Sequence, residues 1–357
     1  MHRIAVFPGD GIGPEVVREG LKVLRTVSEV AGFKYELEEF PHSSEHYLAT
    51  DVLLPPDLLQ RLRDFSAIYL GAIGDPRLPV GFVERGIILG MRFGLDLYIN
   101  LRPVKLYSER FCPLKDKTPE DVDMVIIREN TEGAYSQVGG ILRKGTPEEV
   151  SVTNMINTRA GVERAIRYAF ELCRKQKRGK VTLVDKANAI QAHDLWTRAF
   201  AEVGEEYPEI EKDHAYVDAA CMWMIKSPEW FEVIVTPNLF GDIITDIGAM
   251  IQGGMGVAAS ANIHPGRVSM FEPIHGSAPK YKGKNVANPI AAIVAIQMML
   301  DYLGEMEGAA LIDAALNRLF QTDRIRSLSA GAHKTDEIGA MIMDEVRKSA
   351  DSVAKHT

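Results

Sequence analysis

Residues 4–30, IAVFPGDGIGPEVVREGLKVLRTVSEV, contain the pattern that decides the fold. The apolar run at residues 4–7 is typical of a buried strand, and residues 15–30 repeat apolar side chains at helical spacing. The turn between the two runs lacks the G-x-G-x-x-G spacing of the dinucleotide-binding fingerprint. We therefore interpret Gly9-Asp10-Gly11-Ile12-Gly13 as a tight strand-to-helix connection.

The same alternation of short apolar runs and longer helical patterns continues along the chain. Further strand-like runs occupy residues 67–70, 123–127, 181–185 and 233–236. Residues 158–175 form the clearest helical pattern, in which Thr158 can cap the first turn. This alternation predicts an α/β fold with a largely parallel sheet.

A hairpin arm is predicted in the middle of the chain. Gly139-Gly140 are followed by a polar stretch at residues 143–150 and then by alternating apolar residues at 152–156. With 357 residues the chain is long enough for two domains. No Pro/Gly/Ser-rich linker divides it into halves, which indicates that the chain crosses between its domains more than once.

The composition argues against several classes of protein. A net charge of -8 and the lack of a basic motif disfavour a nucleic-acid partner. Cys112, Cys173 and Cys221 form no C-x-x-C pair, so neither a disulfide framework nor a zinc site is expected. The start of the chain lacks the apolar region of a signal peptide, and no apolar stretch reaches the roughly 20 residues that span a bilayer. We expect a cytoplasmic protein without a membrane partner.

Two carboxylates define the first candidate site. Asp242 and Asp246 follow the strand-like run at 233–236, and on a helix their spacing places them on one face, roughly 5 to 6 Å apart. Like charges so close favour a shared cation, and hard oxygen ligands suit Mg²⁺ or Mn²⁺. Aspartate is also common at a solvated helix start, so spacing alone leaves both interpretations open.

A second group of candidates is cationic. Arg92, Arg102 and Arg128 would hold a dicarboxylate if their guanidinium groups converged on one pocket, although each alone also fits an ordinary ion pair. Tyr135 and Lys186 are possible acid/base groups. The loop at residues 272–279, EPIHGSAP, can wrap a nucleotide or simply form a turn.

Six strings connect these separate candidates. GDGIGPE, NLRPVK, RENTEGAY, DKAN, NLFGDIITD and EPIHGSAP occur in this order over essentially the whole chain. Together they resemble the β-decarboxylating dehydrogenases of isopropylmalate, isocitrate, homoisocitrate, tartrate and D-malate. The resemblance implies two α/β domains around a mixed sheet, which is not the Rossmann fold. Residues 1–98 and 254–357 would form the first, cofactor-binding domain, and 99–253 the second, with a dimerisation arm at about 139–157.

The resemblance also assigns roles. It implies that a 2-hydroxy acid is oxidised, that hydride passes to NAD or NADP, and that CO₂ is lost. The implied substrate-carboxylate ligands are Arg92, Arg102 and Arg128, the metal ligands for Mg²⁺ or Mn²⁺ are Asp218, Asp242 and Asp246, and the catalytic pair is Tyr135 and Lys186. The implied cofactor residues are Glu272, His275, Gly276, Ser277, Ala278, Lys280, Tyr281 and Asn288. A homodimer would share its active sites, because Lys186 and Asp218 would reach into the neighbouring subunit; pairing of dimers into tetramers is left open.

The substrate prediction rests on the helix before Arg92, where the family distinguishes its substrates. Ile88 and Leu89 offer an apolar wall that rejects a third carboxylate and favours a 3-alkylmalate such as 3-isopropylmalate. The longer strings RENTEGAYSQVGG and NLFGDIITDIG are most similar to the tartrate and D-malate branch, which stays as an alternative. Isocitrate and homoisocitrate are less favoured. A regulatory subunit without activity is disfavoured too, because every ligand is present.

The cofactor is left open between NAD and NADP. NAD-using members usually place an aspartate directly after HGSAP, to accept hydrogen bonds from the adenosine ribose. This chain has Lys280-Tyr281 there, which resembles the NADP-using isocitrate dehydrogenases. A cation at this position favours a 2′-phosphate.

Overall fold

The computed structural model describes residues 1–354 and divides into two compact units. Within the described residues, the first unit contains Met1–Leu97, Lys105–Pro119 and residues 249–354, and the second contains Tyr98–Val104 and Glu120–Gly248. The chain therefore crosses between units several times. The expected division placed residues 105–119 and 249–253 in the second domain and Tyr98 in the first, whereas the two units divide these residues the other way.

Contacts of the segment Lys105–Pro119 explain that difference. The Lys105 ammonium lies 2.7 Å from the Asp313 carboxylate, and the Tyr107 ring stacks on Phe320 with 5.1 Å between centroids. Arg110 donates to the carbonyl of Ile325 at 2.9 Å. The segment is thus fastened to residues 313–325 of the first unit, which follow it by about 200 positions and could not be paired with it by sequence pattern.

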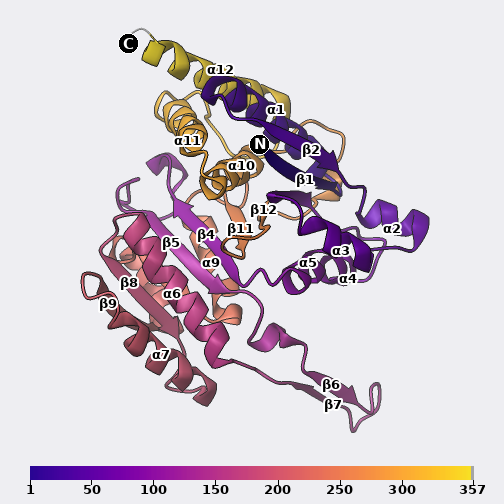
Figure 1. The fold of residues 1–357 in the computed structure, drawn as a ribbon, viewed down its shortest axis with the longest axis vertical. Helices are drawn as coiled ribbons and strands as arrows, with labels where there is room; N and C mark the ends of the chain where they lie inside the picture. Colours follow the sequence, from indigo (N-terminus) through magenta and orange to yellow (C-terminus); the bar gives the residue numbers. More distant parts are fainter. Residues whose placement is uncertain (355–357) are drawn as a thin grey trace. The chain divides into compact units, whose positions relative to one another are not determined.

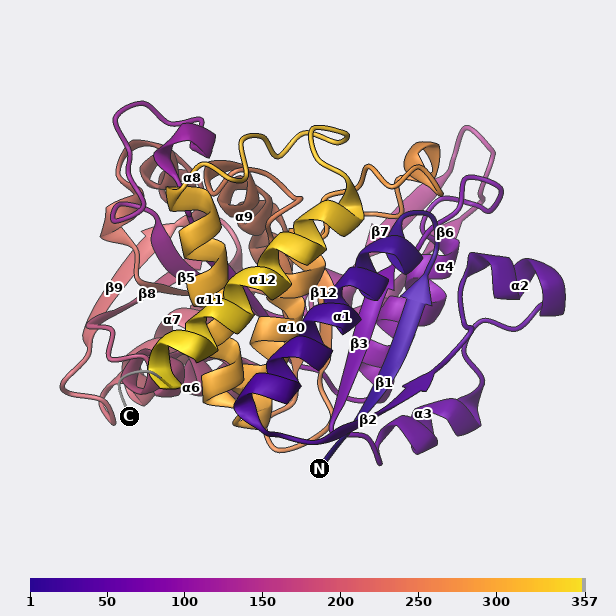
Figure 2. The same cartoon turned by 90° about the horizontal axis from the view of Figure 1, so that it is seen from above.

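The first unit is a five-stranded sheet between helices (Figures 1 and 2). Its strands are hydrogen-bonded in the order β2 (Tyr35–Glu39), β1 (His2–Gly9), β3 (Ala67–Ala72), β12 (Met270–Pro273) and β11 (Ala259–Ile263); only the β11–β12 pair is antiparallel. The helices that pack together on one side are α1 (Gly13–Ala31), α10 (Ile290–Leu303), α11 (Met306–Gln321) and α12 (Thr335–Ala354). The others are α2 (Ser44–Thr50), α3 (Pro56–Leu62), α4 (Phe82–Glu84), the π-helix η1 (Arg85–Leu89) and α5 (Gly90–Gly94).

Alternation along β3 shows how both faces of this sheet are buried. Ile68 and Leu70 belong to a core with Leu62 and Met91, which lie on α3 and α5. Tyr69 points to the opposite face, where its hydroxyl donates to the carbonyl of Ala292 on α10 at 3.0 Å. Successive side chains of a strand face opposite ways, so one continuous apolar run serves two helical layers.

The second unit repeats this plan on a smaller scale. Its strands follow the order β4 (Ile99–Lys105), β5 (Asp123–Glu129), β10 (Val233–Thr236), β8 (Lys180–Asp185) and β9 (Glu211–Tyr216), with β5, β10, β8 and β9 parallel. Its helices are α6 (Arg159–Lys175), α7 (Asp194–Gly204), α8 (Val217–Lys226) and α9 (Asn238–Ile251). Thr158 caps α6 by accepting from the Gly161 amide at 3.0 Å, as predicted.

The predicted arm is an antiparallel hairpin of the second unit (Figure 1). Its strands are β6 (Gly139–Leu142) and β7 (Val150–Thr153), and every residue of both is exposed in the described chain. Short 3-10 turns, η2 to η6, occupy Glu109–Phe111, Ala134–Ser136, Gln191–His193, Pro228–Trp230 and Pro279–Tyr281. Among the described residues, no helix combines the length and apolarity needed to cross a membrane.

The turn after β1 is the tight connection that the sequence predicts. Gly9 and Gly11 adopt φ of 78° and 59°, in the left-handed region that favours glycine. A Cβ on Gly9 would lie 2.1 Å from the carbonyl oxygen of Ala72, and one on Gly11 would lie 1.9 Å from that of Ser277. These glycines let the first turn of the fold approach two other backbones closely.

Candidate active site

Arg128 is the centre of the site in the second unit. It lies near the carboxyl end of β5, and its side chain is only 2% exposed. Its Nη1 is 2.5 Å from Oδ1 of Asp242, while Nε and Nη2 donate to Oδ1 of Asn238 at 3.0 and 2.8 Å. A buried guanidinium requires such partners, since desolvating an unpaired charge is costly.

Tyr135 joins the same cluster from the η3 turn. Its hydroxyl donates to Oδ2 of Asp242 at 2.9 Å, and the guanidinium carbon of Arg128 lies 5.3 Å from its ring centroid. The structure therefore brings together three of the predicted residues, one from each of the substrate, metal and catalytic groups.

Two residues without a predicted role give the cluster its shape. A Cβ on Gly241 would lie 2.4 Å from Cγ of Arg128, so the arginine stem passes directly over this turn of α9. Asn238 accepts from Arg128 and donates to the carbonyl of Glu132 at 3.1 Å. The string NLFGD contains both residues, but spacing alone did not reveal their contacts with a strand over 100 positions earlier.

A buried carboxylate shapes the loop between β5 and Tyr135. Glu129 accepts hydrogen bonds from the amides of Thr131 and Glu132, at 2.7 and 2.9 Å, and burial raises its pKa. Gly133 follows with φ 71°, which turns the chain toward the η3 turn. The loop that presents Tyr135 is thus fixed by its own side chains.

The predicted metal ligands form two groups. Asp246 is exposed one turn after half-buried Asp242 on α9, and Asp218 is exposed in the first turn of α8. Asp218 accepts from the Lys186 ammonium at 2.6 Å, and this hydrogen bond lowers the pKa of the Asp218 carboxyl. Within residues 1–354 of one chain, no three His, Cys, Asp or Glu side chains are grouped as a metal site.

Three further candidates for substrate binding, Arg92, Ile88 and Leu89, lie in the first unit, and Arg102 lies in the second. Arg92, on α5, is largely buried and lies 3.6 Å from the Glu272 carboxylate, which also accepts from Asn262 at 2.7 Å. Ile88 packs against the core of this unit, and Leu89 is half-buried at the end of the π-helix. Arg102 lies on β4 of the second unit, where its Nε donates to Asn100 at 2.9 Å.

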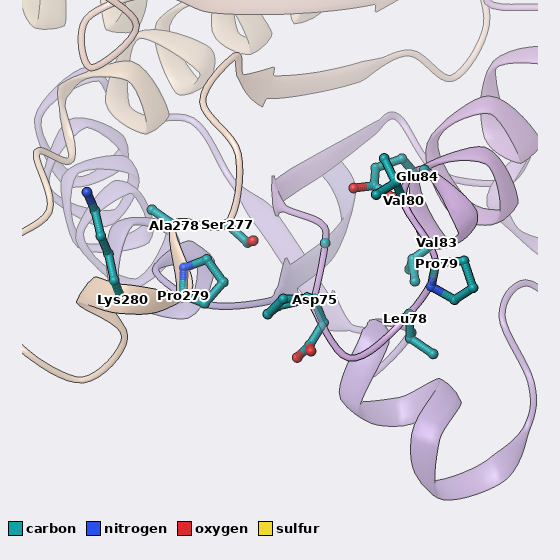
Figure 3. Close-up of a pocket in the computed structure, with 13 residues that line it drawn as sticks. Asp75, Leu78, Pro79, Val80, Val83, Glu84, Ser277, Ala278, Pro279 and Lys280 are labelled. Atoms are coloured by element: carbon teal, nitrogen blue, oxygen red, sulfur yellow. The ribbon is translucent and has the colours of Figure 1, made fainter.

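A cavity of 630 Å³ lies between residues 74–84 and 277–280 of the first unit (Figure 3). Among the predicted cofactor residues, Ser277, Ala278 and Lys280 line it. Figure 3 shows these on one wall and Leu78, Val83 and Glu84 on the other. Ala278 adopts φ 39°, a strained conformation of the kind that gathers at functional loops.

The other predicted cofactor residues lie around this loop. Glu272 is the penultimate residue of β12, and His275 is half-buried, with a pKa lowered by burial. Exposed Gly276 follows, and the Tyr281 ring lies 4.7 Å from the Lys280 ammonium. Asn288 accepts from the Ile290 amide at 3.0 Å, at the start of α10.

The GDGIGPE string holds the cavity walls through two acids that had no predicted role. Asp10 is buried and accepts from the Ser44 hydroxyl at 2.6 Å and from the Gly74 amide at 3.0 Å. Glu15 accepts from the amide of Gly283 at 2.5 Å, beyond the Lys280 segment. Asp10 therefore holds Gly74 on one wall, and Glu15 holds the segment that follows the other wall, although neither acid lines the cavity.

Comparison with known proteins places the chain in the class of decarboxylating dehydrogenases. More narrowly, it belongs to the isocitrate/isopropylmalate dehydrogenase family, whose model matches residues 3–342. The 3-isopropylmalate dehydrogenase of Thermobifida fusca is 47% identical over 347 residues, which cover 96% of this chain and 97% of that protein.

Two solved structures have the same fold. Isocitrate dehydrogenase from Methylococcus capsulatus superposes with a TM-score of 0.87 at 34% identity, covering 97% of this chain and 100% of that one. The apo β-decarboxylating dehydrogenase of Thermococcus kodakarensis gives a TM-score of 0.79 at 31% identity, covering 98% and 97%. The predicted family and the predicted α/β fold class are confirmed.

Proposed function

We propose that this chain is a metal- and nicotinamide-dependent 3-isopropylmalate dehydrogenase. The observation that supports the proposal is the cluster of Arg128, Tyr135 and Asp242, which brings a guanidinium group, a phenol hydroxyl and a carboxylate within hydrogen-bonding distance. Relatives that are 44% and 48% identical to this chain bear the name 3-isopropylmalate dehydrogenase. Apolar Ile88 and Leu89 also suit an isopropyl group better than a third carboxylate.

The donor set of α9 fits a hard divalent cation. Asp242 and Asp246 would hold Mg²⁺ or Mn²⁺ through carboxylate oxygens, with Asp218 supplied by a second copy of the chain. When bound, the cation supplies Lewis-acid chemistry, since it acidifies the substrate hydroxyl and stabilises negative charge on the resulting oxygen.

The chain's own residues orient the substrate and move its protons. The guanidinium of Arg128 has five N–H donors, of which the contacts described above use three, so a substrate carboxylate can accept from the others. The Lys186 amine, in its neutral form, accepts the proton of the substrate hydroxyl as hydride leaves for the nicotinamide. After CO₂ departs, the hydroxyl of Tyr135 donates a proton to the carbon atom from which the CO₂ left.

The cofactor loop supports use of NADP as well as NAD. Lys280 lies on the wall of the 630 Å³ cavity (Figure 3), where its ammonium can pair with a 2′-phosphate. The proposal is that both cofactors are used and that Lys280 determines how well NADP is accepted.

A panel of steady-state rates tests the activity. We expect the highest kcat/KM with 3-isopropylmalate, loss of the rate with EDTA, and its recovery with Mg²⁺ or Mn²⁺. D-Malate or tartrate as best substrate would favour the second candidate, supported by the similarity of RENTEGAYSQVGG and NLFGDIITDIG to that branch. Isocitrate as best substrate would contradict the interpretation of Ile88 and Leu89.

The proposal includes a homodimer with shared sites. Exposed apolar side chains support an interface on the second unit: Leu142 and Val152 on the arm are 66% and 45% exposed, and Met222 on α8 and Ile243 on α9 are 64% and 50% exposed. Light scattering should give twice the mass of the chain.

Mixing two inactive variants tests the sharing of sites. If Lys186 serves the neighbour's Asp242, a mixed dimer of Lys186→Ala and Asp242→Asn has one intact site. Random exchange makes half of all dimers mixed, so roughly a quarter of the wild-type rate returns. Sites confined to single chains would stay inactive in the mixture, because each would retain one of the two defects.

A further inference from the structure

Lys186 lies where the hydrogen-bond ladder of β8 ends. The last residue of β8 paired with β9 is Asp185, so the Lys186 amide has no place in the ladder. Instead it donates to Nδ1 of His193 at 3.1 Å. The carbonyl of Lys186 accepts from the amides of Ala189 and Ile190, at 3.0 and 2.8 Å. The main chain of Lys186 is therefore held at both its polar groups.

The burial and position of His193 suit it to accept this hydrogen bond. It has no exposed surface and lies in the η4 turn directly before α7. Because Nδ1 accepts a hydrogen bond, the ring is neutral and its hydrogen is on Nε2. Burial lowers the pKa of His193, which keeps the ring in this form despite the nearby Asp185 carboxylate.

The other side of the ring contacts the helix of the predicted metal ligands. The rings of His193 and Phe240 are nearly perpendicular, at 87°, with 5.4 Å between their centroids. Phe240 lies in the first turn of α9, two residues before Asp242. His193 thus fills the space between the turn that carries Lys186 and the helix that carries Asp242.

We propose that His193 is a positioning residue for the dehydrogenase reaction, because its ring fixes the main chain of Lys186 against α9. The inference rests on the proposed function, in which the Lys186 amine accepts the proton of the substrate hydroxyl. That amine is at the end of a flexible four-carbon stem, so its place depends on where the main chain holds the stem. Displacement of a reacting group by about 1 Å can cost two orders of magnitude in rate.

Three substitutions separate the hydrogen bond from the packing. His193→Asn places an amide oxygen where Nδ1 lies, at the same distance along the side chain. His193→Leu keeps a buried side chain without an acceptor. His193→Gln carries its acceptor one bond further out and serves as the polar control, should the leucine variant fail to fold.

We expect His193→Leu to lower kcat by about 10- to 100-fold with little change in KM, and His193→Asn to recover most of the loss. With substrate deuterated at C2, the isotope effect on kcat should rise in His193→Leu. Hydroxyl deprotonation and hydride transfer become slower in this variant, so this step limits kcat more strongly. A loss of folded enzyme alone would leave that isotope effect unchanged. Equal kcat in the wild type and His193→Leu, or equal losses in the leucine and asparagine variants, would overturn the inference.

Amide hydrogen exchange gives a readout that does not need activity. The Lys186 amide should exchange faster in His193→Leu and His193→Gln than in the wild type, and His193→Asn should restore its protection. Unchanged protection in His193→Leu would overturn the inference even if the enzyme were inactive. A wild type without activity on any substrate of the panel would instead overturn the proposed function.

Discussion

The cluster around Arg128 and the cavity wall that carries Lys280 differ in how their charged side chains are buried and paired. Arg128 is 2% exposed and pairs with Asp242 and Asn238, and the backbone of α9 lies against its stem. Lys280 is exposed, and its ammonium contacts the ring of the adjacent Tyr281. The first residue cannot change without disturbing its partners, whereas the second can change alone.

The reaction and the choice of cofactor therefore depend on differently built regions. The chemistry of the reaction depends on groups held within tenths of an ångström, so it needs buried, mutually fixed side chains. The choice of cofactor depends on a charge near the rim of a cavity, which water screens and one substitution can reverse. Breaking the first region should therefore cost much more than altering the second.

Arg128→Met is expected to have the largest effect. It removes the donors for the substrate carboxylate and leaves Asn238 and Asp242 without their cation, so kcat/KM should fall by about a thousandfold or more. Arg128→Lys retains the charge without the planar fork and should recover only part of the loss. Steady-state kinetics alongside circular dichroism measure both. Nearly full activity in Arg128→Met would remove this residue from the site.

Gly241→Ala tests the fixed geometry without removing a charge. The new Cβ would lie 2.4 Å from Cγ of Arg128, so the arginine or α9 must shift, and we expect kcat/KM to fall by roughly a hundredfold. Overpacking of this kind also costs about 1 to 3 kcal/mol of stability. Gly179→Ala is the matched control, because the nearest atom to its Cβ is 3.7 Å away. Equal kinetics in the two variants would mean that Arg128 adapts freely.

A similar contrast explains some of the strands that the sequence predicted or missed, although the buried strands β11 and β12 were also missed. The apolar runs at residues 67–70, 123–127 and 233–236 became β3, β5 and β10, because strands buried on both faces are continuously apolar. β2 and β9 lie at the sheet edges and were not predicted. Glu211–Tyr216 has no buried residue in the described chain, so it carries no apolar signal.

Prediction of the site had a similar limit. The motifs named Arg128, Tyr135 and Asp242, and the structure brings these three together, while their assigned roles stay predictions. Asn238 was not predicted because it contributes to the site by accepting a hydrogen bond from Arg128, which is 110 positions away in the sequence. Asp10 was missed for the same reason, since its partners Ser44 and Gly74 follow by 34 and 64 positions.

Lys280→Asp should alter the second region without disturbing the first. Replacing the cation by an acceptor for the ribose hydroxyl should lower the NADP/NAD ratio of kcat/KM by about tenfold or more, while kcat at saturating NAD stays nearly constant. Lys282→Asp is the control, because Lys282 pairs with Glu45 at 3.2 Å and does not line the cavity. An unchanged ratio in Lys280→Asp would mean that another residue selects the cofactor.

The smallest effect is expected from Asp75, on the cavity wall of the first unit. Hydrogen bonds from Arg77, 2.7 Å away, lower the pKa of Asp75 to about 2. A lowered pKa means that the folded state prefers the ionised carboxyl. Its contribution is therefore complete above the ordinary pKa near 4 and is lost as pH falls from about 4 toward 2.

Asp75→Asn should thus cost less than about 1 kcal/mol near pH 7, because the Arg77 side chain is 53% exposed and water screens the pair. The difference from the wild type should shrink as urea unfolding is repeated at lower pH, down to about pH 3. Asp64→Asn, which changes an exposed carboxyl just after α3, controls for the general effect of acid. A difference that grows toward low pH would mean that Asp75 is stabilised in its protonated form. Ionisation of Asp75 beside Arg77 would then not stabilise the folded chain, unlike the pair that Asp242 forms with buried Arg128.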